Sequence, residues 1–358
     1  MKGKVVVGMS GGVDSSVAAY LLKQQGYDVI GVTMQLWRED AEDAKAENGG
    51  CCGLSAAEDA RWVAEILGIP HYVMNFRREF KRHVTDYFVE EYLAGRTPNP
   101  CIACNRYVKW EALLQRSLRL GADYIATGHY ARICRLPNGR FTVRRSVTAA
   151  KDQTYALYNL TQEQLSHTLM PVGEYAKEQI REIAGAAGLP VARKPDSQEI
   201  CFVPDKDYAG FIDREAGDRV PGQGNFVTAE GKILGRHRGI THYTIGQRRG
   251  LGLPMGKRVF VTEIRPETDQ VVVGSEEDLM ATEVLCHRVN FMSVEHIAAP
   301  VRVKAKIRYN HGGEFCRIEE IPGGRIRCTF ERKVRAATPG QSVVFYDGEY
   351  VLGGGIIL

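Results

Sequence analysis

The chain has 358 residues, 44% of them hydrophobic and 25% charged, a composition typical of a folded globular protein with two or three domains. No apolar run approaches the ~20 residues that a membrane-spanning helix needs, and the short apolar start does not resemble a secretory signal. Nine cysteines, an odd number, argue against a secreted scaffold built on disulfides. We therefore expect a cytoplasmic protein without a membrane partner.

The first part of the chain, up to about residue 130, alternates strands and helices in its apolar pattern. The pattern predicts strands at residues 5–8, 28–37, 71–76 and 123–130 and helices at 14–25, 55–67, 79–93 and 106–120. Such alternation favours a doubly wound α/β domain, in which a parallel sheet carries helices on both faces.

The later part of the chain has a different texture. A hairpin is predicted at residues 132–146, followed by a helical stretch at 174–188. From about residue 215, short alternating runs between glycine-rich turns predict small β domains, the last of them a β-barrel. We divide the chain into a catalytic domain at 1–214, a central β domain at 215–280 and a C-terminal barrel at 281–358.

The net charge of +4 is only mildly basic, but the charges are unevenly distributed. Seven Lys or Arg residues and no Asp or Glu lie between Lys232 and Arg258. Such a patch suits a polyphosphate partner such as RNA, and it is equally compatible with an ordinary solvated surface.

The predicted strand at residues 5–8 runs into "MSGGVDSS" and then into a helix. The small residues of this loop let the backbone approach an anion, and the helix start supplies N–H groups and the positive end of a dipole. Asp14 is unusual in a phosphate cradle unless a metal ion such as Mg²⁺ bridges it to a nucleotide. The segment has neither the Gly-Lys-Ser/Thr of a Walker loop nor the Gly-x-Gly-x-x-Gly of a dinucleotide fold.

"SGGVDSS" resembles the PP-loop of ATP pyrophosphatases, which split ATP into AMP and pyrophosphate. The stretches "GRTPNPCIACNRYVKW", "ATGHYAR", "KDQTYALYNL", "KPDSQEICF", "IGQRRGLGL", "KIRYN" and "TPGQSVVFYDGEYVLGGG" together resemble the tRNA-specific 2-thiouridylase family over essentially the whole chain. The resemblance implies thiolation at C2 of the wobble uridine, position 34, in the tRNAs for Lys, Glu and Gln. ATP would adenylate the uridine O2 with release of pyrophosphate, and sulfur would then displace AMP.

The same resemblance assigns the site residues. ATP, with Mg²⁺ reaching Asp14, would be held by Gly8, Met9, Ser10, Gly11, Gly12, Val13, Asp14, Ser15, Met34 and Gly128. Asn99, Pro100 and Cys101 would face the target base. The tRNA would be contacted within the helical part of the catalytic domain (about 150–214) and beyond, by His129, Lys151, Asp152, Gln153, Arg308, Tyr309 and Gln341.

Cys101 and Cys104 form a Cys-x-x-Cys pair before an apolar stripe with helical spacing. We therefore expect Cys104 just before a helix N-terminus, with Asn105 as its cap. The helix dipole and the neighbouring Arg106 and Lys109 would favour the thiolate that a sulfur nucleophile requires.

Two sulfur routes follow from the resemblance. In a relay, Cys201 receives a persulfide from a donor protein fed by a cysteine desulfurase, and Cys104 then releases the sulfur and forms a transient disulfide with Cys201. One branch of the family carries Asp where this chain has Cys101. Three thiolates at Cys101, Cys104 and Cys201 would instead suit a [4Fe–4S] cluster with one open iron.

The remaining cysteines receive simpler interpretations. Zinc is disfavoured because no second Cys-x-x-Cys or His pair has suitable spacing. Cys51 and Cys52 are interpreted as non-catalytic, and the others as small core residues: Cys134, Cys286, Cys316 and Cys328.

Two rival functions stay open at this point. One is a different PP-loop synthetase that acts on a small metabolite, and the other is a non-catalytic RNA-binding or redox-sensing protein. The cysteine set and the β domains suited to RNA disfavour the first, and the intact "SGGVDSS" disfavours the second.

Overall fold

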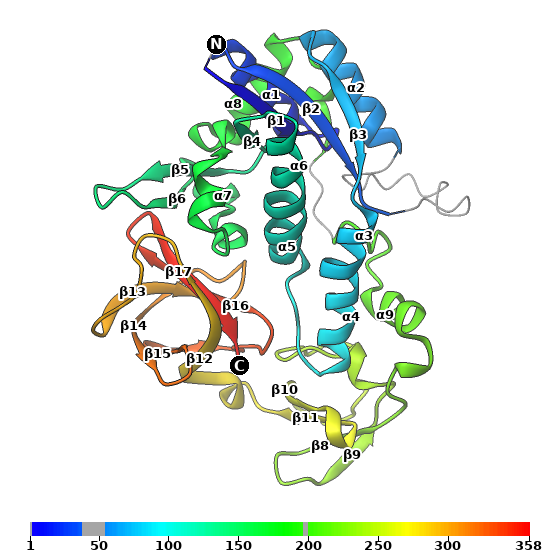
Figure 1. Ribbon diagram of the computed structural model, residues 1–358. Helices are drawn as coiled ribbons and strands as arrows, with labels where there is room; N and C mark the ends of the chain where they lie inside the picture. The colour runs from blue at the N-terminus through cyan, green and yellow to red at the C-terminus, as the bar shows by residue number, and fades with distance from the viewer. Residues whose placement is uncertain (1, 38–53, 196–199) are drawn as a thin grey trace.

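The computed structural model describes residues 2–37, 54–195 and 200–358, so the interpretation of Cys51 and Cys52 lies outside the described residues. Figure 1 shows the parallel sheet with α1, α2 and α8 at one end of the molecule and the β domains at the other, with the helices α4 and α5 between them. Within the described part of the chain, no helix is both long and apolar enough to cross a membrane.

The first sheet is parallel and has the strand order β3-β2-β1-β4-β7. Its strands are β1 (Lys4–Gly8), β2 (Asp28–Gln35), β3 (His71–Asn75), β4 (Tyr124–Ala126) and β7 (Thr168–Leu169). The β1 side chains alternate between two cores: Val5 and Val7 pack in one, and Val6 packs in the other. Because both faces are covered, the doubly wound α/β prediction is confirmed.

One face of this sheet packs against α1 (Val13–Gln24), α2 (Leu54–Leu67) and α8 (Lys177–Ala186). The other face packs against a helix made of α5 (Pro100–Ala103), the π-helical segment η3 (Cys104–Leu113) and α6 (Leu114–Arg119). The helix predicted at 79–93 likewise contains a π-helical segment, with α3 (Arg77–Phe80), η2 (Lys81–Thr85) and α4 (Asp86–Leu93) in series. Shorter segments follow before the central β region: η4 (Ala149–Lys151), η5 (Thr154–Leu157), α7 (Gln162–Ser166), η6 (Pro171–Glu174), η7 (Pro190–Arg193) and α9 (Tyr208–Ala216), the last of which crosses the predicted domain boundary at 214.

The central β region has a four-stranded sheet in the order β10-β11-β8-β9. Its strands are β8 (Asn225–Val227), β9 (Ile233–Arg236), β10 (Phe260–Arg265) and β11 (Gln270–Gly274). Phe226, Val261 and Val271 are fully buried at its core. Short 3-10 turns flank it: η8 (Gly217–Arg219), η9 (Ile240–His242), η10 (Pro266–Thr268) and η11 (Glu277–Leu279).

The C-terminal region is a closed antiparallel barrel, as predicted, because β12 pairs with both β15 and β17. Its strands are β12 (Met280–Phe291), β13 (Val301–Lys306), β14 (Glu314–Ile321), β15 (Arg325–Arg335), β16 (Ser342–Asp347) and β17 (Tyr350–Ile357). Three of the predicted core cysteines, Cys286, Cys316 and Cys328, are fully buried inside it.

The hairpin of β5 (Ala131–Arg135) and β6 (Phe141–Arg145) confirms the prediction at 132–146 and also connects the two ends of the molecule. Its second strand pairs with β17 through Arg144 and Tyr350. The Thr142 hydroxyl donates to the Val351 carbonyl at 2.6 Å, in the interior of this junction. The catalytic domain therefore extends the barrel sheet by two strands.

Candidate active site

The PP-loop is shaped by close backbone contacts at two glycines. Gly11 has a φ of +65°, and a Cβ there would lie 2.4 Å from the Ala56 carbonyl oxygen at the start of α2. A Cβ on Gly128 would lie 2.5 Å from the Ser15 nitrogen at the start of α1. The loop thus fits only glycine at both positions, and Gly128 sits against the loop where the resemblance places it.

Loop hydroxyls stabilise the turn between β1 and α1. Ser15 and Ser16 donate to the Gly12 carbonyl at 3.2 and 2.9 Å, and the Ser10 N–H donates to the Ser15 hydroxyl at 3.2 Å. Gly12, the N-cap residue of α1, has no side chain to cap the helix. The first backbone N–H groups of α1 are therefore available to an anion.

The other predicted nucleotide residues are mostly buried. Met9, Val13 and Met34 have relative exposures of 2%, 3% and 8%, so their side chains belong to the core and only their backbones and edges face the loop. Met34 lies near the carboxyl end of β2, next in the sheet to β1 and its loop. The nucleotide assignments stay predictions, placed together at one edge of the sheet.

Asp14 is the charged centre of the loop and has two partners that the sequence analysis missed. Lys177, in the first turn of α8, donates to both carboxylate oxygens at 2.7 and 2.9 Å, and the Tyr130 hydroxyl donates to Oδ1 at 2.6 Å. Lys177 is only 7% exposed. A lysine on the same helical stripe as the buried Ile180 and Ala184 was the available signal, because lysine is rarely buried without a role.

The Asp14 carboxylate also bears on the predicted Mg²⁺. Three of its lone-pair positions already accept hydrogen bonds, which leaves one for an ion whose other ligands come from phosphates and water. Asp14 therefore fits a Mg²⁺ that arrives with the nucleotide. Among the described residues, no group of three or more His, Cys, Asp or Glu side chains is arranged to hold a metal ion.

The helix that carries the Cys-x-x-Cys pair begins earlier than predicted. Asn99 is its N-cap, accepting from the backbone N–H groups of Cys101 at 3.1 Å and Ile102 at 3.3 Å, and Pro100 is its first residue. The expectation that Cys104 precedes the helix was wrong, because Asn-Pro is itself a strong helix start. Cys101 lies in the first turn, and Cys104 opens the π-helical segment.

Asn105 does not cap this helix. It is buried, its amide donates to the Ala156 carbonyl at 3.0 Å, and its side-chain oxygen accepts from Lys109 at 2.8 Å. The π-helical winding of this segment widens the turn, as is frequent at functional sites.

Cys104 and Cys201, 97 positions apart in the sequence (201 − 104), belong to the same part of the fold. Both pack, half-buried, against one hydrophobic cluster that includes Phe80, and Phe202 packs there as well. Cys101 is exposed. Among the described residues, these three sulfurs do not form a metal-binding group.

The barrel contributes Tyr309 to the surroundings of Cys101. Its hydroxyl donates to the Asp152 carbonyl at 3.4 Å, and its ring lies 6.0 Å from that of Tyr155. Burial first, and then the negative charges of Asp152 and Cys101, raise the pKa of the Tyr309 hydroxyl. Three predicted residues from distant segments therefore lie within electrostatic reach of one another.

Several predicted tRNA contacts join parts of the protein to each other. Gln341 of the barrel donates to the carbonyls of Thr97 at 2.9 Å and Pro98 at 3.2 Å. Gln153 accepts from the Tyr130 N–H at 2.9 Å, and Arg308 donates to the Arg335 carbonyl at 2.7 Å. Their roles toward tRNA stay predictions, but each side chain also positions a neighbouring segment.

His129 is a half-buried residue at the centre of this region. Its Nδ1 lies 2.6 Å from the Thr127 hydroxyl, and its ring lies 5.5 Å from that of Trp110. Burial, and secondarily the charge of Lys109, lower the pKa of His129 well below its usual value. The imidazole is therefore neutral at physiological pH, and we expect it to recognise RNA through hydrogen bonding and stacking.

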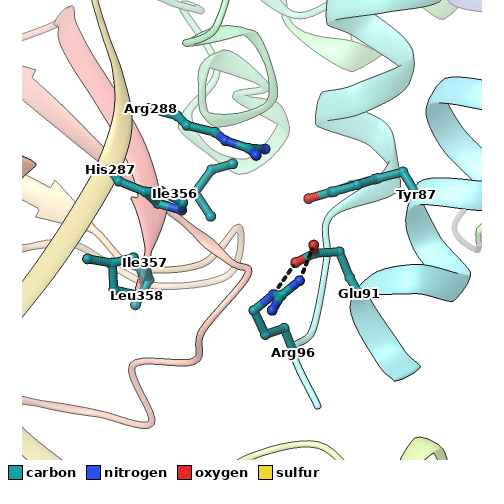
Figure 2. Close-up of a pocket in the computed structure, with 8 residues that line it drawn as sticks. All are labelled: Tyr87, Glu91, Arg96, His287, Arg288, Ile356, Ile357 and Leu358. Atoms are coloured by element: carbon teal, nitrogen blue, oxygen red, sulfur yellow. Dashed lines mark hydrogen bonds and ion pairs between the residues drawn. The ribbon is translucent and has the colours of Figure 1, made fainter. Parts of the chain in front are cut away.

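A cavity of about 340 Å³ lies between α4 and the barrel (Figure 2). Glu91 and Arg96 form a two-pronged ion pair at 2.7 Å on the catalytic side, facing His287 and Arg288 of the barrel. Burial raises the pKa of Tyr87, whose hydroxyl points across the cavity, to about 12. This polar cavity adjoins the contact between the domains, where the Thr97 N–H donates to the Pro339 carbonyl.

Known proteins match the whole chain. Residues 3–205 match the family described as tRNA methyl transferase HUP domain, residues 209–275 the tRNA methyl transferase PRC-barrel domain, and residues 281–357 the aminomethyltransferase beta-barrel domain. A crystal structure of a 4-thiouridine synthetase–RNA complex with bound ATP aligns with a TM-score of 0.35 and 17% identity over 61% of this chain and 51% of that one.

Curated relatives match far more closely. The tRNA-specific 2-thiouridylase MnmA of Lachnoclostridium phytofermentans is 65% identical over 99% of both chains. The protein of the same name from Clostridium acetobutylicum is 58% identical over 100% of both chains. With this identity over its full length, the chain belongs to the tRNA-specific 2-thiouridylase family.

Proposed function

We propose that the protein is an ATP-dependent sulfurtransferase that thiolates C2 of the wobble uridine in the tRNAs for Lys, Glu and Gln. The observation that carries the proposal is a chain of contacts from the nucleotide loop to the thiols. The Tyr130 hydroxyl binds Asp14, and the Tyr130 N–H binds Gln153. The next residue back, Asp152, accepts from Tyr309, which lies within electrostatic reach of Cys101. These contacts support a site in which the nucleotide and the target base lie next to each other.

In the first step the uridine O2 attacks the α-phosphate of ATP, and the bond to the β-phosphate breaks so that pyrophosphate leaves. The N–H groups at the start of α1 would bind the phosphates, and Lys177 would place its positive charge beside them. Mg²⁺ carried by the nucleotide would add further charge neutralisation. Because the wobble base lies in a single-stranded loop, it can enter the site at modest cost.

In the second step the terminal sulfur of a Cys201 persulfide attacks C2 and AMP leaves, which joins Cys201 to the base through a disulfide. The Cys104 thiolate then attacks the Cys201 sulfur, which releases the thiolated base and forms a Cys104–Cys201 disulfide. An external dithiol must reduce that disulfide. The shared packing of the two cysteines supports this pairing.

The sulfur would come from a donor protein in the cytoplasm, fed by a cysteine desulfurase. The alternative route uses a [4Fe–4S] cluster on Cys101, Cys104 and Cys201, and it predicts that the purified protein contains iron and sulfide. Anaerobic purification followed by iron and sulfide analysis separates the two, since the relay requires neither element in stoichiometric amounts.

The function is tested with Cys104→Ala and Cys201→Ala, and Cys134→Ala serves as the matched control because Cys134 lies in the β5–β6 hairpin. We expect both site variants to lose 2-thiouridine, measured by mass spectrometry of digested tRNA, while tRNA binding and the single-turnover release of pyrophosphate from ATP on tRNA addition are retained. Normal 2-thiouridine in either site variant would refute the assignment. ATP–pyrophosphate exchange driven by a small carboxylate without tRNA would favour a metabolite synthetase instead.

A further inference from the structure

A row of cations follows the outer face of β13. Val303, Ala305 and Ile307 are buried in the barrel core, and the alternation of the strand places Lys304 and Lys306 on the opposite face. Side chains two residues apart on a strand are separated by about 6.6 Å. That spacing is comparable with the distance between neighbouring phosphates of an RNA strand.

Lys306 lies in an aromatic setting. Its ammonium is 5.9 Å from the centre of the Tyr155 ring and 5.8 Å from that of Tyr309, and the side chain is half-buried. Burial lowers the pKa of Lys306, and the charges of Arg145 and Lys304 add to this effect, whereas Asp152 opposes it. The positive charge of the Lys306 ammonium is therefore only partly offset by the negative charge of Asp152.

Arg145, at the end of β6, faces the same place. Its guanidinium lies 4.5 Å over the Tyr346 ring, and its buried Nε–H has no hydrogen-bond partner among the described residues. The neighbouring Arg144 differs, because Glu349 satisfies it at 2.5 and 2.8 Å. A buried donor left without an acceptor is unfavourable, so the Arg145 Nε–H suits an acceptor that the described residues do not supply.

Asp152 offsets only part of this charge. Its carboxylate accepts from the Ser146 N–H at 3.2 Å and the Thr154 hydroxyl at 2.7 Å, and it is one carboxylate beside the three cations Arg145, Lys304 and Lys306. The other carboxylate near Arg145, Glu349, is paired with Arg144. An excess of positive charge beside an unsatisfied donor favours an anionic ligand.

We propose that Arg145 and Lys306, with Lys304 beside them, bind backbone phosphates of the RNA next to the target nucleotide. The inference rests on the proposed function, and it assigns the phosphate contacts to residues outside the predicted tRNA set. Tyr309 connects the cations to the thiol site, because its ring lies 5.8 Å from the Lys306 ammonium and its hydroxyl is within electrostatic reach of Cys101. The phosphates of ATP are the other source of this chemistry, but the PP-loop provides for them at the opposite side of Tyr130.

The test measures tRNA affinity as a function of salt for Lys306→Met, Arg145→Gln and Arg145→Lys. We expect Lys306→Met and Arg145→Gln each to weaken binding about tenfold and to reduce the salt slope by about 0.7, the value for one phosphate contact on a single strand. Arg145→Lys should keep the slope, because it keeps the charge. ATP affinity should be unchanged in all three.

Arg302→Gln is the matched control, since Arg302 lies on the same strand and pairs with Glu331 instead. It is about 13 Å along the strand from Lys306, beyond the ~10 Å Debye length at 0.1 M salt, so its slope should equal that of the wild type. Folded variants with a wild-type slope would overturn the inference while the proposed function stands. A loss of ATP affinity alone would overturn it in favour of the nucleotide. A wild-type protein that neither binds nor thiolates tRNA would refute the proposed function itself.

Discussion

The nucleotide half and the thiol half of the candidate site are built in different ways. The PP-loop is one short segment between β1 and α1, fixed by backbone contacts at Gly11 and Gly128. The surroundings of Cys101 are assembled from the 97–104 segment, the 151–154 segment and two barrel segments, at 306–309 and 339–341. The first half needs only the catalytic domain to fold, whereas the second also needs the barrel to dock against it.

This difference predicts separate consequences of mutation. Changes in the loop should impair reaction with ATP and leave tRNA binding intact. Changes at the barrel contacts should impair placement of the base and leave ATP binding intact.

The largest effect is expected for Lys177→Met. The substitution removes the ammonium that donates to both oxygens of Asp14, and with it a positive charge at the loop where the phosphates are expected. We expect tRNA-dependent AMP formation to fall about 10²–10³-fold, the range for removal of one preorganised donor, with little change in tRNA affinity.

Lys81→Met is the control for this variant, because Lys81 forms an exposed ion pair with Asp86 away from the loop. Lys177→Arg separates charge from packing, because it keeps a cation beside Asp14. It should retain much of the AMP formation that Lys177→Met loses, and an equal loss in both folded variants would refute the assignment of the charge to catalysis.

A smaller effect is expected for Gln341→Ala. The side-chain amide supports the carbonyls of Thr97 and Pro98, directly before the Asn99 cap of the cysteine helix. Two hydrogen bonds of ordinary strength are lost, so we expect the thiolation rate at low tRNA concentration to fall about tenfold while ATP affinity is unchanged.

Hydrogen exchange gives a second measurement on the same variant. The backbone N–H of Cys101 and of Ile102 should exchange faster if Gln341 positions the loop. Unchanged exchange with weakened tRNA binding would assign Gln341 to direct RNA contact instead.

The two halves of the site also differ in how much of each could be predicted from the sequence. The PP-loop could be predicted because its determinants are local: a buried strand, a run of small residues and a helix start within one segment. The partner of Asp14 could not, because Lys177 is 163 residues away and reaches it only through the packing of α8 on α1. The Gln341 contact spans 244 residues and depends on domain docking.

The start of the helix that carries Cys101 and Cys104 was predicted wrongly, although nearby residues indicate it correctly. The prediction starts the helix at residue 106 because the apolar spacing begins there. That spacing shows which face of a helix is buried, and it does not show where the first turn begins. Asn99 followed by Pro100 is an N-cap before a residue preorganised for the first helical position. Reading the cap before the stripe would have put Cys101 inside the helix.

The smallest effect is expected for the stability of the fold at acidic pH, to which one histidine in each half of the site contributes. Burial lowers the pKa of His71, which contacts Thr33 behind the PP-loop, and lowers that of His129 in the thiol half much further. Below the unfolded value of about 6.5, the unfolded chain binds protons that the folded imidazoles do not, so stability falls as the pH drops through this window. The slope is at most about 1.4 kcal/mol per pH unit for each such group.

The measurement is the free energy of urea unfolding between pH 7.5 and about pH 5, a range above the titration of exposed carboxylates such as Glu331 and Glu349, whose ion pairs lower their pKa values. His129→Gln should flatten the pH dependence more than His71→Gln, because its folded-state pKa is lowered further. The reverse order would mean that water solvates the His129 imidazole better than that of His71, which would contradict the burial that lowers its pKa and would remove the reason to expect a neutral imidazole there.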